Sequence, residues 1–200
     1  MPLSNHRRDW VTGWSVGRLL RQRWPLPAIL STKPGLMDPG RRLHEWTFLN
    51  DTGAWCPTLA PDDPIAGWAE AWKRFGYTFS PSWDYREKVF EVSAGDDLPM
   101  GFHGIVDCAG SLRGKMTVLD IKTGGPADQH GVQLAFYALG LFPQTARNLQ
   151  RANVYVKKNG SYRLVVRDDP RDFVACQELL QQAKETHGYS KNTGARHRTA

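Results

Sequence analysis

Cysteine is scarce in this 200-residue chain, and its three cysteines lie far apart. Cys56, Cys108 and Cys176 form no Cys-x-x-Cys pair, so they do not supply the four thiolates of a closed metal site. An odd number of cysteines also cannot form a full set of disulfides. This cysteine usage fits a protein of a reducing compartment.

Long apolar runs are also missing. None approaches the roughly 20 residues that a membrane-spanning helix requires, which excludes an integral membrane protein. The N-terminus carries His6, Arg7 and Arg8 but no continuous apolar segment and no small-residue cleavage site, so we expect no secretory signal. A cytoplasmic location is the resulting expectation.

Motifs for nucleotide binding and for nucleophilic hydrolysis are absent as well. The glycine-rich turn Gly124-Gly125-Pro126 lacks the spacing of a P-loop or a dinucleotide fingerprint, so no nucleotide cofactor is implied. No Gly-x-Ser-x-Gly or other nucleophile signature occurs, so serine or cysteine hydrolysis has no support.

Basic residues and tryptophans are concentrated near the N-terminus. The net charge is +6, and residues 1–42 contain eight basic residues against Asp9 and Asp38. All eight tryptophans lie within the first 83 residues. Arginine interleaved with aromatic side chains suits an anionic partner such as nucleic acid, with phosphates held and bases stacked. The alternative is a helical layer whose tryptophans are core and whose arginines are solvated.

The apolar period changes from helical to alternating near Ser82, which predicts an α/β fold. Helices are expected at residues 9–23, 41–49, 64–75, 131–142 and 170–186. Strands are expected at 84–93, 101–108 and 115–122, and a hairpin joins 152–157 to 161–167. We expect one domain over residues 1–187, mostly helical over 1–80 with its core over 82–187, and a basic, flexible tail at 188–200.

Acidic residues and a lysine interrupt two of the predicted strands. Asp107 follows an apolar pair at the end of one strand, and Asp120 and Lys122 share one face of the next. Two carboxylates at neighbouring strand ends are suited to a divalent cation, and a lysine beside them to orienting a water molecule or neutralising a phosphate. The alternative is an edge strand with solvent-facing ion pairs.

A polar pair on the following helix adds to this pattern. Gln133 and Tyr137 are four residues apart and therefore share a helical face. An amide and a phenol beside a metal site are suited to contacting a phosphate or base, whereas the simpler alternative is an exposed glutamine and a core tyrosine.

Five short motifs follow one another in an order typical of a known family. They are Gly40-Arg41-Arg42-Leu43-His44-Glu45, Glu87, Gly104-Ile105-Val106-Asp107, Asp120-Ile121-Lys122-Thr123-Gly124 and Gln133-Leu134-Ala135-Phe136-Tyr137-Ala138. Together they resemble the PD-(D/E)XK nuclease superfamily, and most closely its RecB-like branch, which includes phage exonucleases. The resemblance implies a restriction-endonuclease-like core, a central mixed sheet flanked by helices, with a helical N-terminal region.

The resemblance also implies a metal centre. Asp107 and Asp120 would bind Mg²⁺ or Mn²⁺ with the backbone carbonyl of Ile121, and His44 would complete the metal shell. Lys122 would position the attacking water. Val106 stands where the family's name-giving Pro-Asp motif has proline. This substitution is common in the RecB-like branch and leaves the Asp107 carboxylate in place. The iron–sulfur members of the branch need four thiolates, so no such cluster is expected here.

Further residues receive supporting roles from the same resemblance. Glu87 would be the acidic residue of the first strand, with Glu91 as the alternative on the same face. Gln133 and Tyr137 would steady the site and meet the DNA backbone, and Arg41 and Arg42 would support them. Apart from the resemblance, the basic, tryptophan-bearing composition of the N-terminus suggests that this segment, with Arg7, Arg8 and Arg18, guides a DNA end into the site.

The implied activity is that of a metal-dependent deoxyribonuclease, with a phage-type exonuclease of recombination or DNA-end processing favoured. An endonuclease of the same fold and a non-catalytic nucleic-acid-binding protein remain alternatives. DNA is the expected partner. A homo-oligomer is possible, as is a single-strand annealing or recombination partner. The expected location is the cytoplasm of a bacterium or of a phage-infected host.

Overall fold

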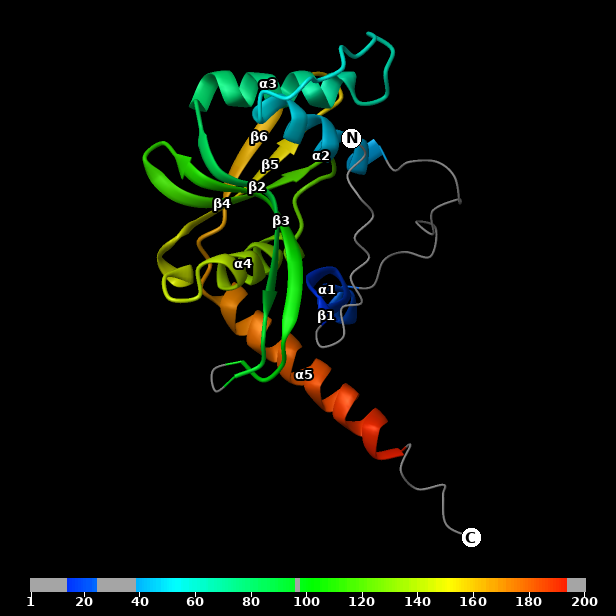
Figure 1. Ribbon diagram of the computed structural model, residues 1–200, viewed down its shortest axis with the longest axis vertical. Coiled ribbons are helices and arrows are strands. Elements are labelled where there is room, and N and C mark those ends of the chain that lie inside the picture. The colour runs from blue at the N-terminus through cyan, green and yellow to red at the C-terminus, as the bar shows by residue number, and fades with distance from the viewer. Residues whose placement is uncertain (1–13, 25–38, 96–97, 194–200) are drawn as a thin grey trace.

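A mixed β-sheet runs through the centre of the structure (Figure 1). The computed structural model describes residues 14–24, 39–95 and 98–193. Six strands occur in this part of the chain: β1 (Trp14–Ser15), β2 (Ser82–Val92), β3 (Phe102–Leu112), β4 (Lys115–Lys122), β5 (Gln150–Val156) and β6 (Tyr162–Val166). Their order is β1-β3-β4-β5-β6, and β2 pairs with β3 outside this path. The pairs β1–β3 and β4–β5 are parallel and the others antiparallel.

Strand β3 has neighbours on both edges, but one edge is interrupted. β2 pairs with β3 over residues 102–111, so β1 and β4 share the opposite edge. β1 pairs there with residues 102–103, and β4 with residues 108–112. Residues 104–107 therefore have no strand beside them on that edge within the described part of the chain. Asp107 lies at the border of this gap.

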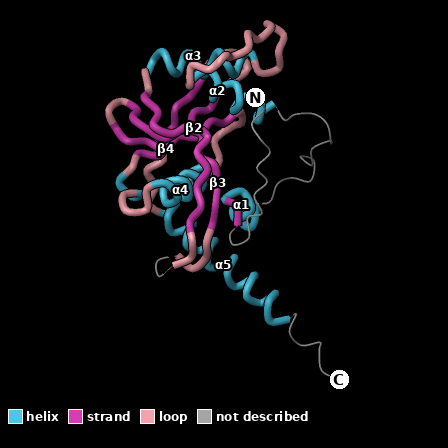
Figure 2. Tube along the Cα trace, viewed as in Figure 1, coloured by secondary structure: helices cyan, strands magenta, loops and turns pink. Residues whose placement is uncertain are grey.

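Helices cover both faces of the sheet (Figure 2). Helices α1 (Val16–Arg23), α4 (Gln129–Leu141) and α5 (Arg171–Thr193) enclose one hydrophobic core, which we call the α4 core. Helices α2 (Pro39–Asp51) and α3 (Ala66–Phe79) enclose the other, which we call the α3 core. A short 3₁₀ helix, η2 (Ala146–Asn148), precedes β5. The expected α/β fold, a mixed sheet flanked by helices, is confirmed.

Most predicted elements lie within a few residues of those observed, with two exceptions at the ends of the chain. Residues 9–13 of the helix expected at 9–23 lie outside the described residues. The described helix begins at Val16, because Trp14 and Ser15 pair with β3 and the Ser15 hydroxyl accepts a hydrogen bond from Arg18 N as the helix cap. The last helix extends to Thr193, seven residues beyond the expected end and into the segment expected to be a flexible tail. Among the described residues, no helix has the length and apolar character to cross a bilayer.

Some of the described tryptophans are buried in a helical layer and others are exposed or lie beside an arginine. Trp46 and Trp72 are buried in the α3 core, as the helical-layer alternative requires. Trp55 is 83% exposed, and Trp14 packs at the edge of the α4 core with the Arg18 guanidinium 4.0 Å from its ring centroid. Trp10, Arg7 and Arg8 lie outside the described residues.

The turn of the β5–β6 hairpin packs directly on α3 at Gly67, where a Cβ atom would overlap the backbone carbonyl of Lys158. We expect Gly67→Ala to lower the free energy of unfolding by about 1–3 kcal/mol, since the helix or the turn must move. Gly76→Ala, on the same helix with no atom within 4 Å of the added Cβ, is the matched control and should stabilise by up to about 1 kcal/mol. Urea denaturation of both variants measures the difference, and an equal effect at the two positions would contradict this packing.

Candidate metal and active site

Three side chains from three elements meet beside the gap in the sheet. His44 comes from α2, Glu87 from β2 and Asp107 from β3, and one ligand atom of each lies within 4.8 Å of the others. His44 Nδ1 is 3.3 Å from Asp107 Oδ1 and 3.5 Å from Glu87 Oε1. The structure thus brings together three of the predicted site residues, of which His44 and Asp107 are 63 positions apart in the sequence. We call these three the acidic cluster.

The alternation of faces along β3 changes phase at Asp107. Phe102 and Val106 belong to the α4 core, whereas Cys108 and Leu112 belong to the α3 core. In a regular strand these residues would share one face, because each is an even number of positions from the next. The carboxylate of Asp107 therefore lies where the strand passes from one core to the other.

Glu87 lies at the corresponding point of β2. Arg86 pairs with Cys108 and Lys88 with Val106, which places Glu87 opposite Asp107. Its backbone is left-handed, with φ of 47°. This conformation costs a residue other than glycine about 1–3 kcal/mol and is concentrated at functional sites. The surrounding structure therefore holds Glu87 against a local preference, with its carboxylate next to His44.

Strands β3 and β4 separate at the same level. Their last pair is Cys108 with Leu119, and one further step of the register would pair Asp107 with Asp120. Instead, the backbone N–H of Ile121 donates a 2.7 Å hydrogen bond to Asp107 Oδ2. The carboxylate thus takes the place of a ladder acceptor, and its other oxygen is directed to His44.

Asp120 and Lys122 form the second part of the site, on the face of β4 that α4 covers. Asp120 is buried, and its Oδ2 lies 3.0 Å from Lys122 Nζ and accepts a 2.9 Å hydrogen bond from Asn153 Nδ2. Lys122 Nζ also donates to Gln133 Oε1 at 2.9 Å, and Gln133 Nε2 donates to Tyr137 Oη at 2.6 Å. The glutamine and tyrosine of α4 therefore hold the lysine rather than face solvent.

Burial and opposite charges determine the ionisation of the site. Burial lowers the pKa of His44, but the Asp107 and Glu87 carboxylates outweigh it and raise the pKa to about 11. Burial raises the pKa of Asp120 to about 6, against the opposing effect of Lys122. The pKa of Lys122 is raised, because Asp120 and Asp107 outweigh the effect of burial. His44 and Lys122 are thus cations that offset buried carboxylates at neutral pH.

The donor set suits a hard divalent cation. Glu87 Oε1 is buried and makes no hydrogen bond beyond its 3.5 Å ion pair with His44 Nδ1, and a metal ion would supply a closer partner. Carboxylate oxygens and an imidazole nitrogen are ligands that Mg²⁺ and Mn²⁺ accept. The chemistry of His44, Glu87 and Asp107 therefore fits a divalent metal ion; Asp120, which the sequence also predicts as a ligand, is not part of this cluster.

Several predicted residues lie apart from the acidic cluster. Arg42 forms a 2.8 Å ion pair with Asp63, which precedes α3, and it is not part of the acidic cluster. Arg41 is exposed on α2. Glu91 pairs with His103 in the ladder, outside the cluster that contains Glu87.

Arg86 is a supporting residue that the sequence did not single out. Its guanidinium is buried and donates to the Asp107 backbone carbonyl at 2.6 Å and to Thr47 Oγ1 at 3.1 Å. It also lies 3.2 Å from Asp51 Oδ2. Thr47 and Asp51 belong to α2, the helix that carries His44, so Arg86 fixes this helix against β3. A single arginine between Tyr85 and Glu87 has no distinguishing local pattern.

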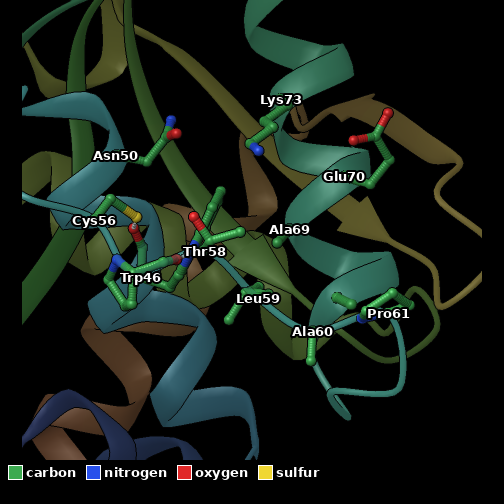
Figure 3. Close-up of a pocket in the computed structure, with 12 residues that line it drawn as sticks. Trp46, Asn50, Cys56, Thr58, Leu59, Ala60, Pro61, Ala69, Glu70 and Lys73 are labelled. Atoms are coloured by element: carbon green, nitrogen blue, oxygen red, sulfur yellow. Dashed lines mark hydrogen bonds between the residues drawn. The ribbon is translucent and has the colours of Figure 1, made fainter.

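A separate cavity of about 350 Å³ lies between α2, the loop that follows it and α3 (Figure 3). It is lined by Trp46, Cys56 and Lys73, among others. No residue of the acidic cluster lines it, and neither Asp120 nor Lys122 does. This cavity is therefore distinct from the candidate metal site.

Comparison with known proteins gives only distant similarities. No protein-family model matches the sequence, and no curated protein matches it significantly. Among solved structures, the alkaline exonuclease LHK-Exo from Laribacter hongkongensis matches with a TM-score of 0.46 and 13% identity, over 92% of this chain and 94% of that chain. Its complex with dAMP gives 0.44 and 14% over the same shares. SSO0001 gives 0.39 and 15%, over 86% and 84%. Because all three TM-scores lie below 0.5, the function has to be inferred from the site itself.

Metal binding should depend on pH in a defined way. His44 keeps a proton up to about pH 11 and Asp120 up to about pH 6 in the metal-free protein. A metal ion that binds His44 must displace its proton, so we expect Mn²⁺ affinity to rise about tenfold per pH unit from pH 7 to 9, and more steeply below pH 6. Calorimetric titration across this range tests the prediction. Affinity that stays constant from pH 7 to 9, or an unchanged slope in His44→Gln, would exclude the histidine as a ligand.

Removal of Arg86 should destabilise the fold. We expect Arg86→Met to lower the free energy of unfolding by about 3–5 kcal/mol, because the largely enclosed Asp51 carboxylate would lose its ion-pair partner and the Asp107 carbonyl would lose a hydrogen bond. The control is Arg74→Met, which removes an exposed ion pair with Glu70 and should cost less than about 1 kcal/mol. Similar denaturation midpoints for the two variants would show that Arg86 does not link α2 to β3.

Proposed function

We propose that this chain is a divalent-metal-dependent deoxyribonuclease. The observation that carries the proposal is the placement of two buried carboxylates, Asp107 and Asp120, where β3 and β4 separate. The partly buried Lys122 lies beside Asp120, and Asp107 belongs to the acidic cluster with His44 and Glu87. Burial of so many charges is unfavourable for a purely structural element. A protein that only binds nucleic acid has no use for such a site.

The metal ligands would be Asp107, Asp120, Glu87 and His44, with the Ile121 carbonyl as a further oxygen donor. Bound Mg²⁺ or Mn²⁺ polarises a scissile phosphate and lowers the pKa of a water molecule. The Ile121 N–H fixes one oxygen of Asp107, and the second oxygen lies toward His44. The protein thus holds its ligands in place before the ion arrives.

Lys122 is the residue that would act on water or on the phosphate. An ammonium has three N–H donors, and Asp120 and Gln133 accept two of them. The third is available to orient a water molecule or to neutralise charge that develops on a phosphate oxygen. Gln133 and Tyr137 keep the ammonium in place, because each hydrogen bond of that chain restrains the next side chain.

DNA is the proposed substrate, and an exonuclease of the phage type, acting in recombination or DNA-end processing, is the favoured reading. The excess of basic residues supports an anionic polymer, and the order of the sequence motifs supports the exonuclease branch. Arg41, exposed on the helix of His44, would contact the backbone. An endonuclease of the same fold remains the alternative, and an annealing partner or a homo-oligomer stays a prediction.

The test is digestion of linear and closed-circular DNA with Mg²⁺, Mn²⁺ or chelator. We expect metal-dependent loss of linear DNA alone. Asp120→Asn and Lys122→Met should each reduce the rate about 100-fold or more, since they remove a ligand and a fixed donor without changing side-chain size greatly. Lys115→Met, at the exposed opposite end of β4, is the matched control and should retain activity.

Cleavage of the circle as well would favour the endonuclease. Binding of DNA with no cleavage of either form, under every metal, would contradict the proposal and favour the non-catalytic alternative. Full activity of Asp120→Asn would show that the reaction takes place elsewhere.

A further inference from the structure

A continuous chain of polar side chains runs between the sheet and α4, and it extends beyond the proposed catalytic groups. From Asp120 it continues through Asn153 on β5 to Arg167, which follows β6, then to Tyr155 on β5 and His130 on α4. Each link is 2.7–3.1 Å long. None of these four additional residues belongs to a sequence motif of the site.

Asn153 is fully buried, and both ends of its amide are used. Nδ2 donates to Asp120 Oδ2 at 2.9 Å, and Oδ1 accepts from Arg167 Nε at 3.1 Å. The opposite orientation of the amide would place its oxygen against the carboxylate and its NH₂ against the guanidinium, which loses both hydrogen bonds. Arg167 therefore dictates which way Asn153 points.

Arg167 connects Asn153 to the start of α4, the helix whose Gln133 holds Lys122. Its Nη2 donates to Tyr155 Oη at 2.7 Å and to the Ala127 carbonyl at 3.2 Å, directly before α4. Tyr155 Oη lies 2.8 Å from His130 Nδ1, and because it already accepts from Arg167 its own hydrogen can point to this ring nitrogen. Burial, with the charges of Lys122 and Arg167, lowers the pKa of His130 to about 4, which agrees with a neutral ring that accepts this hydrogen bond.

We propose that Asn153 and Arg167 are positioning residues of the metal site: Arg167 orients the Asn153 amide, and Asn153 holds the Asp120 carboxylate in the geometry that binds the divalent cation. This inference rests on the proposed function, because it assigns Asp120 to the metal. Asn153 would not touch the ion, and Arg167 would act one residue further away. Side chains that orient metal ligands in this way typically contribute a factor of about 10–100 to metal affinity.

The decisive variant is Asn153→Asp. It preserves the side-chain shape and still accepts from Arg167, but it replaces the permanent N–H donor to Asp120 with a second carboxyl group, which either repels the Asp120 carboxylate or shares a proton with it. We expect the Mn²⁺ dissociation constant, measured by calorimetry without DNA, to rise about 10- to 100-fold. Nuclease activity should fall at low Mn²⁺ and recover in part at saturating Mn²⁺, since the metal-bound site is the same once formed. Arg167→Lys, which retains the charge without the fork of donors, should shift the dissociation constant in the same direction and serves if Asn153→Asp does not fold.

The matched control is Arg151→Met. Arg151 is a buried arginine on the same face of β5 as Asn153, but it donates to Asp172, the Asp169 carbonyl and the Gly131 carbonyl rather than to the residues that hold Asp120. Its loss should lower the melting temperature and leave the Mn²⁺ dissociation constant within about twofold, as expected for a residue remote from the metal.

The outcomes separate the two claims. Wild-type protein that binds no Mn²⁺ would overturn the proposed function and this inference with it. Wild-type binding with an unchanged dissociation constant in folded Asn153→Asp or Arg167→Lys would overturn the positioning role alone. An equal loss of affinity in Arg151→Met would show a general effect of destabilisation and would likewise contradict the inference.

Discussion

The structure depends on the burial of carboxylates that must keep their charge. Asp107 and Asp120 are buried between two hydrophobic cores, where an isolated charge is strongly unfavourable, and the partly buried Glu87 lies beside Asp107. The surrounding side chains compensate in pairs: His44 faces Asp107 and Glu87, and Lys122 faces Asp120. One oxygen atom of Glu87 makes no hydrogen bond beyond its 3.5 Å ion pair with His44, a deficit that a further positive group in the site would relieve.

Backbone irregularities create the space for this arrangement. β3 and β4 separate after Cys108 and Leu119, so the Ile121 N–H turns to a side chain rather than to a strand. Opposite, the left-handed Glu87 lets β2 and β3 pass from one core to the other while their register continues. A regular sheet would direct alternate side chains into each core and would leave no place at its centre for converging carboxylates.

The sequence predicted the strands and the Asp120–Lys122 pair because these follow from local alternation, which the printed residues contain. It also placed Gln133 and Tyr137 on one helical face, and the structure shows them in one hydrogen-bonded chain with Lys122. It could not predict Arg86, Asn153 or Arg167, because their contacts depend on which strands become neighbours; Asn153 lies 33 residues from the carboxylate it supports. The preference for Glu87 over Glu91 rested on motif spacing. The left-handed backbone conformation that distinguishes Glu87 has no signal in the local sequence pattern.

The central claim is that a divalent cation binds between Asp107 and Asp120, where the strands separate. Anomalous diffraction from crystals grown with Mn²⁺ tests it most directly. The account predicts an anomalous peak in contact with both carboxylates and with Glu87 or His44, and loss of that peak in Asp120→Asn. A fully ordered site with no peak there at saturating Mn²⁺, or a peak bound only at other residues, would contradict it.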